Sequence, residues 1–145
     1  MMIAIPSDLW AKLHGASTHF PIAMVLGACA FDIVAVLAWE KPLGRDARVA
    51  GTYALVLGAL GGILAVISGL YLTKGEVWGE GALRWHHRFV WPAFGLMVSA
   101  ATWRLVVGDK LPRRSHAIYL VVELVLSGLM AAAGYWGAEL LQGAL

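Results

Sequence analysis

Four long runs of apolar residues constrain the fold of this chain more than any other feature. They cover residues 19–39, 49–73, 86–107 and 117–138. An α-helix needs about 20 such residues to cross the hydrocarbon core of a bilayer, so each run predicts a membrane-spanning helix. Because the connections are short, neighbouring helices are expected to run antiparallel. The sequence therefore predicts an all-α integral membrane protein, with residues 1–145 forming one up-down four-transmembrane-helix bundle.

The composition agrees with lipid as the solvent of this chain. Hydrophobic residues account for 60% of its 145 residues and charged residues for 14%. A soluble domain of this length cannot bury so much apolar surface. The net charge of +2 is too small to indicate a nucleic-acid partner. The single cysteine, Cys29, excludes a disulfide framework or a CxxC pair within the chain. The lipid bilayer is therefore the partner that composition alone predicts.

The residues before the first apolar run lack the basic start and unbroken apolar stretch of a cleavable signal peptide. Residues 7–14 are expected instead to form a short interfacial segment, since Trp10 suits the headgroup level of a bilayer. His14 is expected to end that segment.

Basic residues are distributed unequally between the two sides of the predicted bundle. The connections at residues 40–49 and 104–116 hold seven lysines and arginines, and the opposite side holds four. Basic residues favour the cytoplasmic side of a membrane. The bias predicts a multi-pass membrane protein with its N and C termini on the non-cytoplasmic side.

Histidines gather at one side of the predicted bundle. His14 and His19 precede the first span, and His86 and His87 begin the third, whereas His116 lies alone on the other side. Ionisable residues at membrane depth indicate a functional site. Facing helices that each carry a histidine have the geometry of a bis-histidine haem site, although neutral imidazole also suits copper or zinc.

The expected surroundings favour haem b over a bare metal ion. Aromatic side chains at the same depth could wall a flat slot, and two arginines could pair with propionates. These side chains are Tyr71, Trp85, Trp91, Tyr135 and Trp136, together with Arg84 and Arg88. His19 shares a helical face with small residues and is expected to point at a neighbouring helix, with His14 as the alternative or a residue above the site. Periodicity leaves the choice between His86 and His87 open.

A second polar set lies in the opposite half of the bundle. Asp32, Arg104 and Glu123 are expected at similar depth on three different helices. A lone charge there would cost several kcal/mol, so the simplest interpretation is a structural carboxylate–guanidinium network. The alternative is a proton path or a quinone pocket with His116 at its mouth.

Three segments of the chain resemble a family of predicted four-helix bacterial membrane proteins of unassigned function. The first, HGASTHFPIA at residues 14–23, resembles the family's opening of His, four residues and His-Phe-Pro-Ile-Ala, and Asp32 stands where the family has a carboxylate. The second, SGLYLTKGEVWGEGALRWHHRFV at residues 68–90, is similar to its Gly-rich loop followed by Trp-His-Arg. The third, GYWGAELLQG at residues 134–143, is similar to its final Gly-x-x-Gly-x-x-Leu segment.

The resemblance implies a place in the bacterial inner (plasma) membrane, with the termini on the periplasmic side. It also implies haem b, since similar proteins often occur beside c-type cytochrome domains and are suspected of binding that cofactor. It maps the family's His-Arg dipeptide onto His87 and Arg88, which selects His87 rather than His86. The resemblance thus completes a predicted pair of axial ligands, His19 and His87. Some members carry a further histidine near the position of Tyr135, so a ligand from the fourth helix is not expected here.

These observations predict a membrane b-type cytochrome subunit of a respiratory or photosynthetic complex. Such a protein would pass electrons between one haem near the periplasmic face and a c-type cytochrome or dehydrogenase subunit, beside other membrane subunits. It would be an electron-transfer subunit of an oxidoreductase complex and not an enzyme by itself. The alternatives are a cofactor-free structural or anchoring subunit and a copper- or zinc-handling membrane protein.

Overall fold

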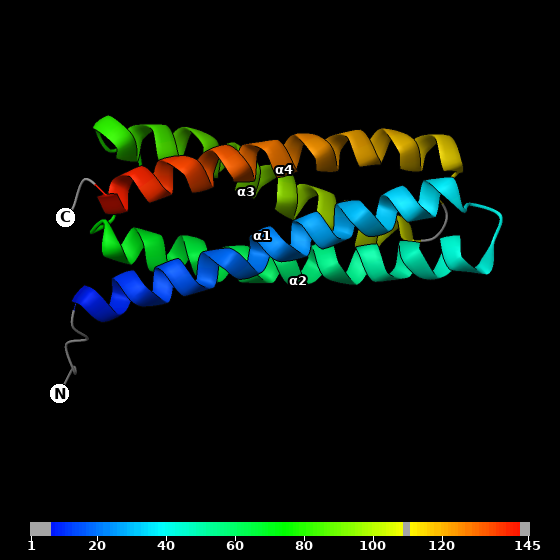
Figure 1. The fold of residues 1–145 in the computed structure, drawn as a ribbon, viewed down its shortest axis with the longest axis horizontal. Coiled ribbons are helices and arrows are strands. Elements are labelled where there is room, and N and C mark those ends of the chain that lie inside the picture. The colour runs from blue at the N-terminus through cyan, green and yellow to red at the C-terminus, as the bar shows by residue number, and fades with distance from the viewer. Residues whose placement is uncertain (1–6, 109–110, 143–145) are drawn as a thin grey trace.

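The computed structural model describes residues 7–108 and 111–142, and these fold into four α-helices without a strand (Figure 1). The helices are α1 (Ser7–Leu37), α2 (Pro42–Leu72), α3 (Gly81–Val107) and α4 (Arg113–Gln142). Each is long and apolar enough to cross a membrane. The predicted fold class, an all-α bundle of four transmembrane helices, is therefore confirmed.

Helix α1 is one continuous helix and differs from the prediction at its start. Residues 7–14 form its first turns, so the separate interfacial segment ending at His14 is not present. The hydroxyls of Ser17 and Thr18 bond back to the carbonyls of His14 and Gly15, at 3.0 and 2.9 Å. Such bonds satisfy serine and threonine within a helix, so the chain has no need to break there.

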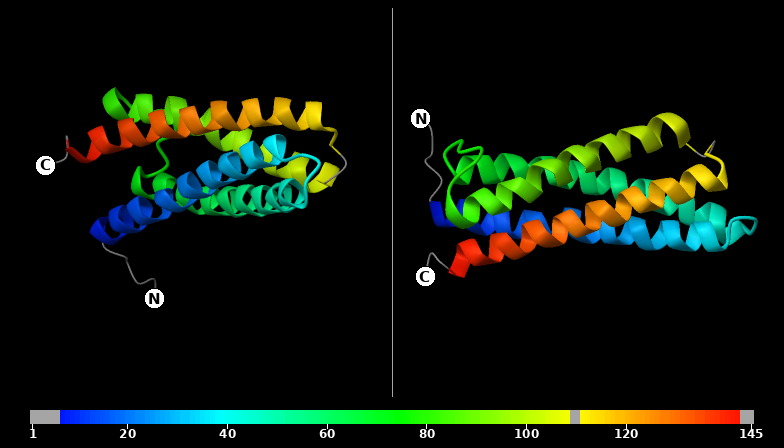
Figure 2. Two further views of the ribbon diagram at one scale, coloured as in Figure 1. Left: turned by 45° about the vertical axis from the view of Figure 1, so that its right-hand side comes forward. Right: turned by 90° about the horizontal axis from the view of Figure 1, so that it is seen from above.

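The four helices pack as two antiparallel hairpins, α1 with α2 and α3 with α4 (Figures 1 and 2). Contacts of α1 with α4 and of α2 with α3 close the bundle. Helix α1 begins and α4 ends at the same end of the bundle (Figure 1). We call this the histidine end, because His14, His19, His86 and His87 lie on the turns nearest to it. The other end, which contains Asp32 and Arg104, is called the arginine end.

Small residues make the helix contacts, and large apolar residues cover the outside. A Cβ atom at Gly58 would lie 3.2 Å from Cβ of Met24 on α1, and one at Gly62 would collide with Met97 on α3. Leu37 and Val106, by contrast, are 77% and 79% exposed. Close backbone approach inside and bulky apolar groups outside are what a lipid solvent favours.

The connection between α2 and α3 folds back over the start of α3. Just after the last residue of α2, Lys74 and Gly75 adopt left-handed backbone conformations, with φ values of 54° and 83°. This is a common way to terminate a helix. The indole Nε1 of Trp91 donates a 2.9 Å hydrogen bond to the carbonyl of Val77, which fixes the connection against α3.

Candidate functional site

His14 lies on α1 at the histidine end and is held by α2. Its Nδ1 is 3.0 Å from the hydroxyl oxygen of Ser68, and that hydroxyl donates its own hydrogen to the carbonyl of Ala65 at 2.9 Å. With the Ser68 hydrogen on Ala65, the imidazole donates from Nδ1, and this tautomer leaves the Nε2 lone pair free. The ring lies against Gly69, where a Cβ atom would come within 2.9 Å of Cε1.

His86 lies on α3 and is held by α4 in the same manner. Its Nδ1 is 2.8 Å from the carbonyl oxygen of Ala133. A carbonyl only accepts, so this imidazole also donates from Nδ1 and keeps Nε2 free. Gly137 provides the space for the ring, because a Cβ atom there would lie 3.4 Å from Cε1 and Nδ1. His86 and His14 are close enough to interact electrostatically.

The structure does not bring His19 and His87 together. His19 is exposed, and its Nδ1 donates to the carbonyl of Gly15 on its own helix at 2.6 Å. His19 lies five positions after His14, which is roughly 140° around an α-helix, so only one of them can face the bundle interior. His87 is 6% exposed and lies beneath the α2–α3 connection, with its ring 5.8 Å from that of His86. Its Nδ1 has no hydrogen-bond partner among the described residues.

The aromatic side chains predicted to wall a haem slot are spread over the histidine end. Trp91 contacts a histidine ring, with centroids of Trp91 and His87 5.9 Å apart. Tyr71 is 59% exposed and packs on Trp10 at 4.1 Å, and Tyr135 is 61% exposed.

The remaining predicted groups lie on the outer side of α3 and α4. Trp85 stacks on Trp136 with centroids 5.8 Å apart, and the Arg88 guanidinium lies 4.9 Å from the Trp85 ring. Arg84 and Arg88 are both exposed at this end. They are placed to meet anionic groups at the bundle surface.

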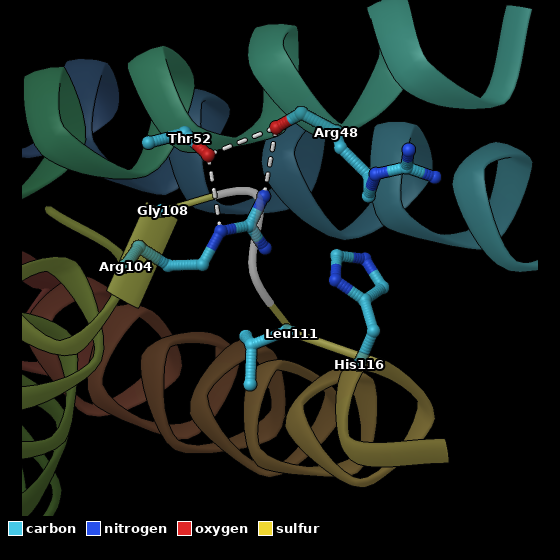
Figure 3. A pocket seen from close by; sticks show the side chains of 6 residues that line it. All are labelled: Arg48, Thr52, Arg104, Gly108, Leu111 and His116. Carbon is cyan, nitrogen blue, oxygen red and sulfur yellow. Dashed lines mark hydrogen bonds between the residues drawn. The ribbon is translucent and has the colours of Figure 1, made fainter. Parts of the chain in front are cut away.

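A buried ion pair occupies the arginine end. Arg104 of α3 donates to both carboxylate oxygens of Asp32 on α1, from Nη1 to Oδ2 at 2.6 Å and from Nη2 to Oδ1 at 3.1 Å. It also donates to the Thr52 hydroxyl at 3.0 Å and to the Arg48 carbonyl at 2.8 Å, both on α2 (Figure 3). Asp32 is fully buried and Arg104 is 3% exposed. The Asp32 carboxylate thus balances the charge of the guanidinium, and acceptors on α1 and α2 receive its hydrogen bonds.

Helix α4 adds a histidine and a carboxyl group to this ion pair. His116, 1% exposed, donates from Nε2 to Oδ1 of Asp32 at 3.0 Å. Glu123 is fully buried and lies beside Asp32 and Tyr119. Neither oxygen of the Glu123 carboxyl group, nor the Tyr119 hydroxyl, has a hydrogen-bond partner among the described residues. The arginine end therefore joins all four helices, and one carboxyl group in it is unpaired.

Sequence reasoning missed the residues that orient the two inward histidines. Ser68, Gly69 and Gly137 are small residues with no motif of their own. A signal existed for Ser68, because it continues a helical face of small residues on α2 that includes Ala54, Gly58, Gly61 and Ala65. Thr52, which bonds Arg104, gave no comparable signal.

A bare metal ion and a haem iron need different numbers of protein ligands. In the described ranges no group of three or more His, Cys, Asp or Glu side chains is arranged to hold a metal ion. Protein zinc sites take three or four such ligands, whereas a haem iron takes axial ligands only because the macrocycle supplies the rest. The two imidazoles, one on α1 and one on α3, match the number of axial ligands that a haem iron takes.

These features define a multi-pass membrane protein built as a four-helix bundle, with a polar cluster at each end. The chain belongs to the family of predicted membrane proteins known as DUF2231, which matches residues 11–143. Comparison with curated proteins and with solved structures gave no match. The match spans both polar clusters, and it agrees with the resemblance found in the sequence.

Proposed function

We propose that this protein is a membrane b-type cytochrome subunit that holds one haem b between α1 and α3 at the histidine end. His14 and His86 are the axial ligands in this proposal, in place of the pair His19 and His87 expected from the sequence. The observation that carries it is how the two rings are held: Nδ1 of each lies within hydrogen-bond distance of an acceptor on a neighbouring helix, at 3.0 and 2.8 Å.

Histidine ligands of metals almost always donate their second ring N–H to a carbonyl or another acceptor, which fixes the ring and its tautomer. Ser68 and the Ala133 carbonyl supply these acceptors from α2 and α4. His19 makes a similar bond, but its ring is exposed on the outside of α1. Bound haem would supply reversible one-electron chemistry, and the protein would supply ligation, orientation and exclusion of water.

Exposed groups at the same end support a redox partner outside the bilayer. Arg84 and Arg88 are available for the propionates, whose pairing with guanidinium groups is strong when bidentate. A periplasmic c-type cytochrome or dehydrogenase subunit is the proposed partner. The large apolar surface of the bundle also leaves room for other membrane subunits.

The test is a reduced-minus-oxidised visible spectrum of the full chain purified from membranes, with haem content measured in parallel. His14→Ala and His86→Ala are expected to lose the low-spin b-type spectrum, since each removes one axial ligand. His19→Ala and His87→Ala are the matched controls at the same depth, and both should retain it. Helical circular dichroism and gel filtration show that each variant is folded.

Three outcomes would overturn this proposal. Loss of the spectrum in His19→Ala and His87→Ala, with retention in the other two variants, would restore the pair expected from the sequence. A wild-type protein that binds no haem and no metal would leave a cofactor-free structural or anchoring subunit. Copper or zinc without haem would indicate a metal-handling protein.

A further inference from the structure

The ion pair at the arginine end does not account for the Glu123 carboxyl group. It is fully buried in the span of α4, and neither oxygen has a hydrogen-bond partner among the described residues. Burying an unpaired carboxylate costs far more free energy than burying a neutral carboxyl group. A buried acid without a partner is therefore a place where the molecule can hold a proton.

The charged and titratable groups that face Glu123 come from three helices. Asp32 and Cys29 lie on α1, Arg104 lies on α3, and Tyr119 lies one helical turn before Glu123 on α4. Arg104 is the one cation among them, and it is already engaged by both oxygens of Asp32. Glu123 therefore has no cation of its own.

The charge balance allows two arrangements of one proton. The charges of Asp32 and Arg104 cancel each other. Glu123 and His116, both in contact with Asp32, are then the two groups of the cluster that can exchange a proton. Glu123 can hold the proton while His116 is neutral, or Glu123 can be ionised while His116 is a cation. The buried cluster has the same net charge in both arrangements, so moving the proton leaves no net charge in the bundle.

A small cavity lies beside His116 at the arginine end. It has a volume of about 10 Å³ and is lined by Arg48, Thr52, Arg104, Gly108, Leu111 and His116 (Figure 3). This is about the size of one water molecule, and the polar lining offers it hydrogen bonds. His116 bonds Asp32 through Nε2, and within the described ranges Nδ1 has no protein partner.

We propose that Glu123 is a proton-binding site in the membrane interior, filled and emptied from the arginine end through His116 and Asp32. A proton from cavity water binds Nδ1 of His116, and the proton on Nε2 passes to Oδ1 of Asp32. The neighbouring Glu123 side chain then rotates to within hydrogen-bond distance of Asp32 and takes this proton, and release runs in reverse. Each transfer breaks one N–H or O–H bond and forms another, and no electrons move. The site does not depend on haem.

The first test is infrared spectroscopy of the full chain in liposomes at neutral pH. The wild-type protein is expected to show the C=O stretch of a protonated carboxyl group, and Glu123→Gln to lack it. Glu40→Gln, which removes an exposed carboxylate, is the matched control and should retain the band. A band that survives in Glu123→Gln, or no such band in the folded wild-type protein, would overturn the proposal.

The second test measures how fast that band shifts after transfer to D₂O. His116→Gln keeps an N–H donor for Asp32 but has no basic nitrogen, so exchange should slow by on the order of 100-fold. Leu111→Phe enlarges an apolar side chain in the cavity wall and replaces no polar residue of the cluster, and it should slow exchange even if His116→Gln does not fold. Exchange at the wild-type rate in either folded variant would exclude this route.

Discussion

At the residue scale, the ion pair of Asp32 and Arg104 shows how a membrane protein keeps a full charge in its interior. The guanidinium has five N–H donors in a fixed fork, and the structure provides acceptors for this fork on α1 and α2. Gly51 allows this approach, because a Cβ atom there would lie 2.9 Å from Oδ1 of Asp32. Removal of one charge would leave the other buried and unpaired.

Asp32→Ala is therefore expected to lower the free energy of unfolding by about 3–5 kcal/mol, the range for breaking a buried pair. The measurement is denaturant unfolding in detergent, followed by circular dichroism. The double variant Asp32→Leu with Arg104→Leu removes both charges and should cost clearly less than the single change. A loss below about 1 kcal/mol in Asp32→Ala would mean that the pair behaves like a solvated surface bridge.

At the scale of elements, helix α2 packs through small residues against two neighbouring helices, α1 and α3. Gly58 packs against Met24 and the Pro21 carbonyl of α1, and Gly62 packs against Met97 of α3. Ser68, further along the helix, orients His14. The two glycines lie four residues apart but face different partners, because α2 lies in the angle between α1 and α3.

Gly58→Leu should separate α1 from α2, since its Cβ would lie 3.2 Å from Met24 Cβ and 3.6 Å from the Pro21 carbonyl oxygen. Backbone atoms and Cβ atoms cannot move aside as the end of a side chain can. We expect a loss of about 1–3 kcal/mol in the free energy of unfolding, the usual range for overpacking. Leu57→Ala is the control on the exposed face of the same helix and should change stability little. Equal effects of the two changes would show that the α1–α2 contact is loose.

At the scale of the whole molecule, the two polar clusters lie at opposite ends of one bundle. The histidine end contains two inward imidazoles, and the arginine end contains the buried ion pair with Glu123. Both ends are built from all four helices, so neither cluster belongs to a single hairpin. The orientation of the bundle decides which cluster faces the cytoplasm.

Reporter fusions test the predicted orientation. A reporter joined after Leu145 should report a periplasmic position, and a reporter in the α1–α2 connection near Lys41 should report the cytoplasm. The reason is the excess of basic residues, seven against four, in the connections at the arginine end. The opposite result would place the histidine end inside the cell and would require a cytoplasmic partner for the proposed haem.

The sequence determined the elements of this protein. The length of an apolar run and its lack of charge are local properties, and in lipid they suffice to specify a spanning helix because the backbone must satisfy its own hydrogen bonds. Short connections then fixed the antiparallel order. The same reasoning placed Asp32, Arg104 and Glu123 in one half of the bundle, and four of the five histidines at the other end.

Only the tertiary structure decided which of those residues face each other. Depth follows from counting residues, but the direction of a side chain depends on how its helix is rotated against its neighbours. That rotation is set by contacts such as His14 with Ser68 and Gly69, which come from distant parts of the chain. His14 therefore turns inward and His19 outward, although the sequence motif contains both. For the same reason the acceptors for Arg104 lie on two other helices, whereas neither Glu123 oxygen has a hydrogen-bond partner in the described part of the chain.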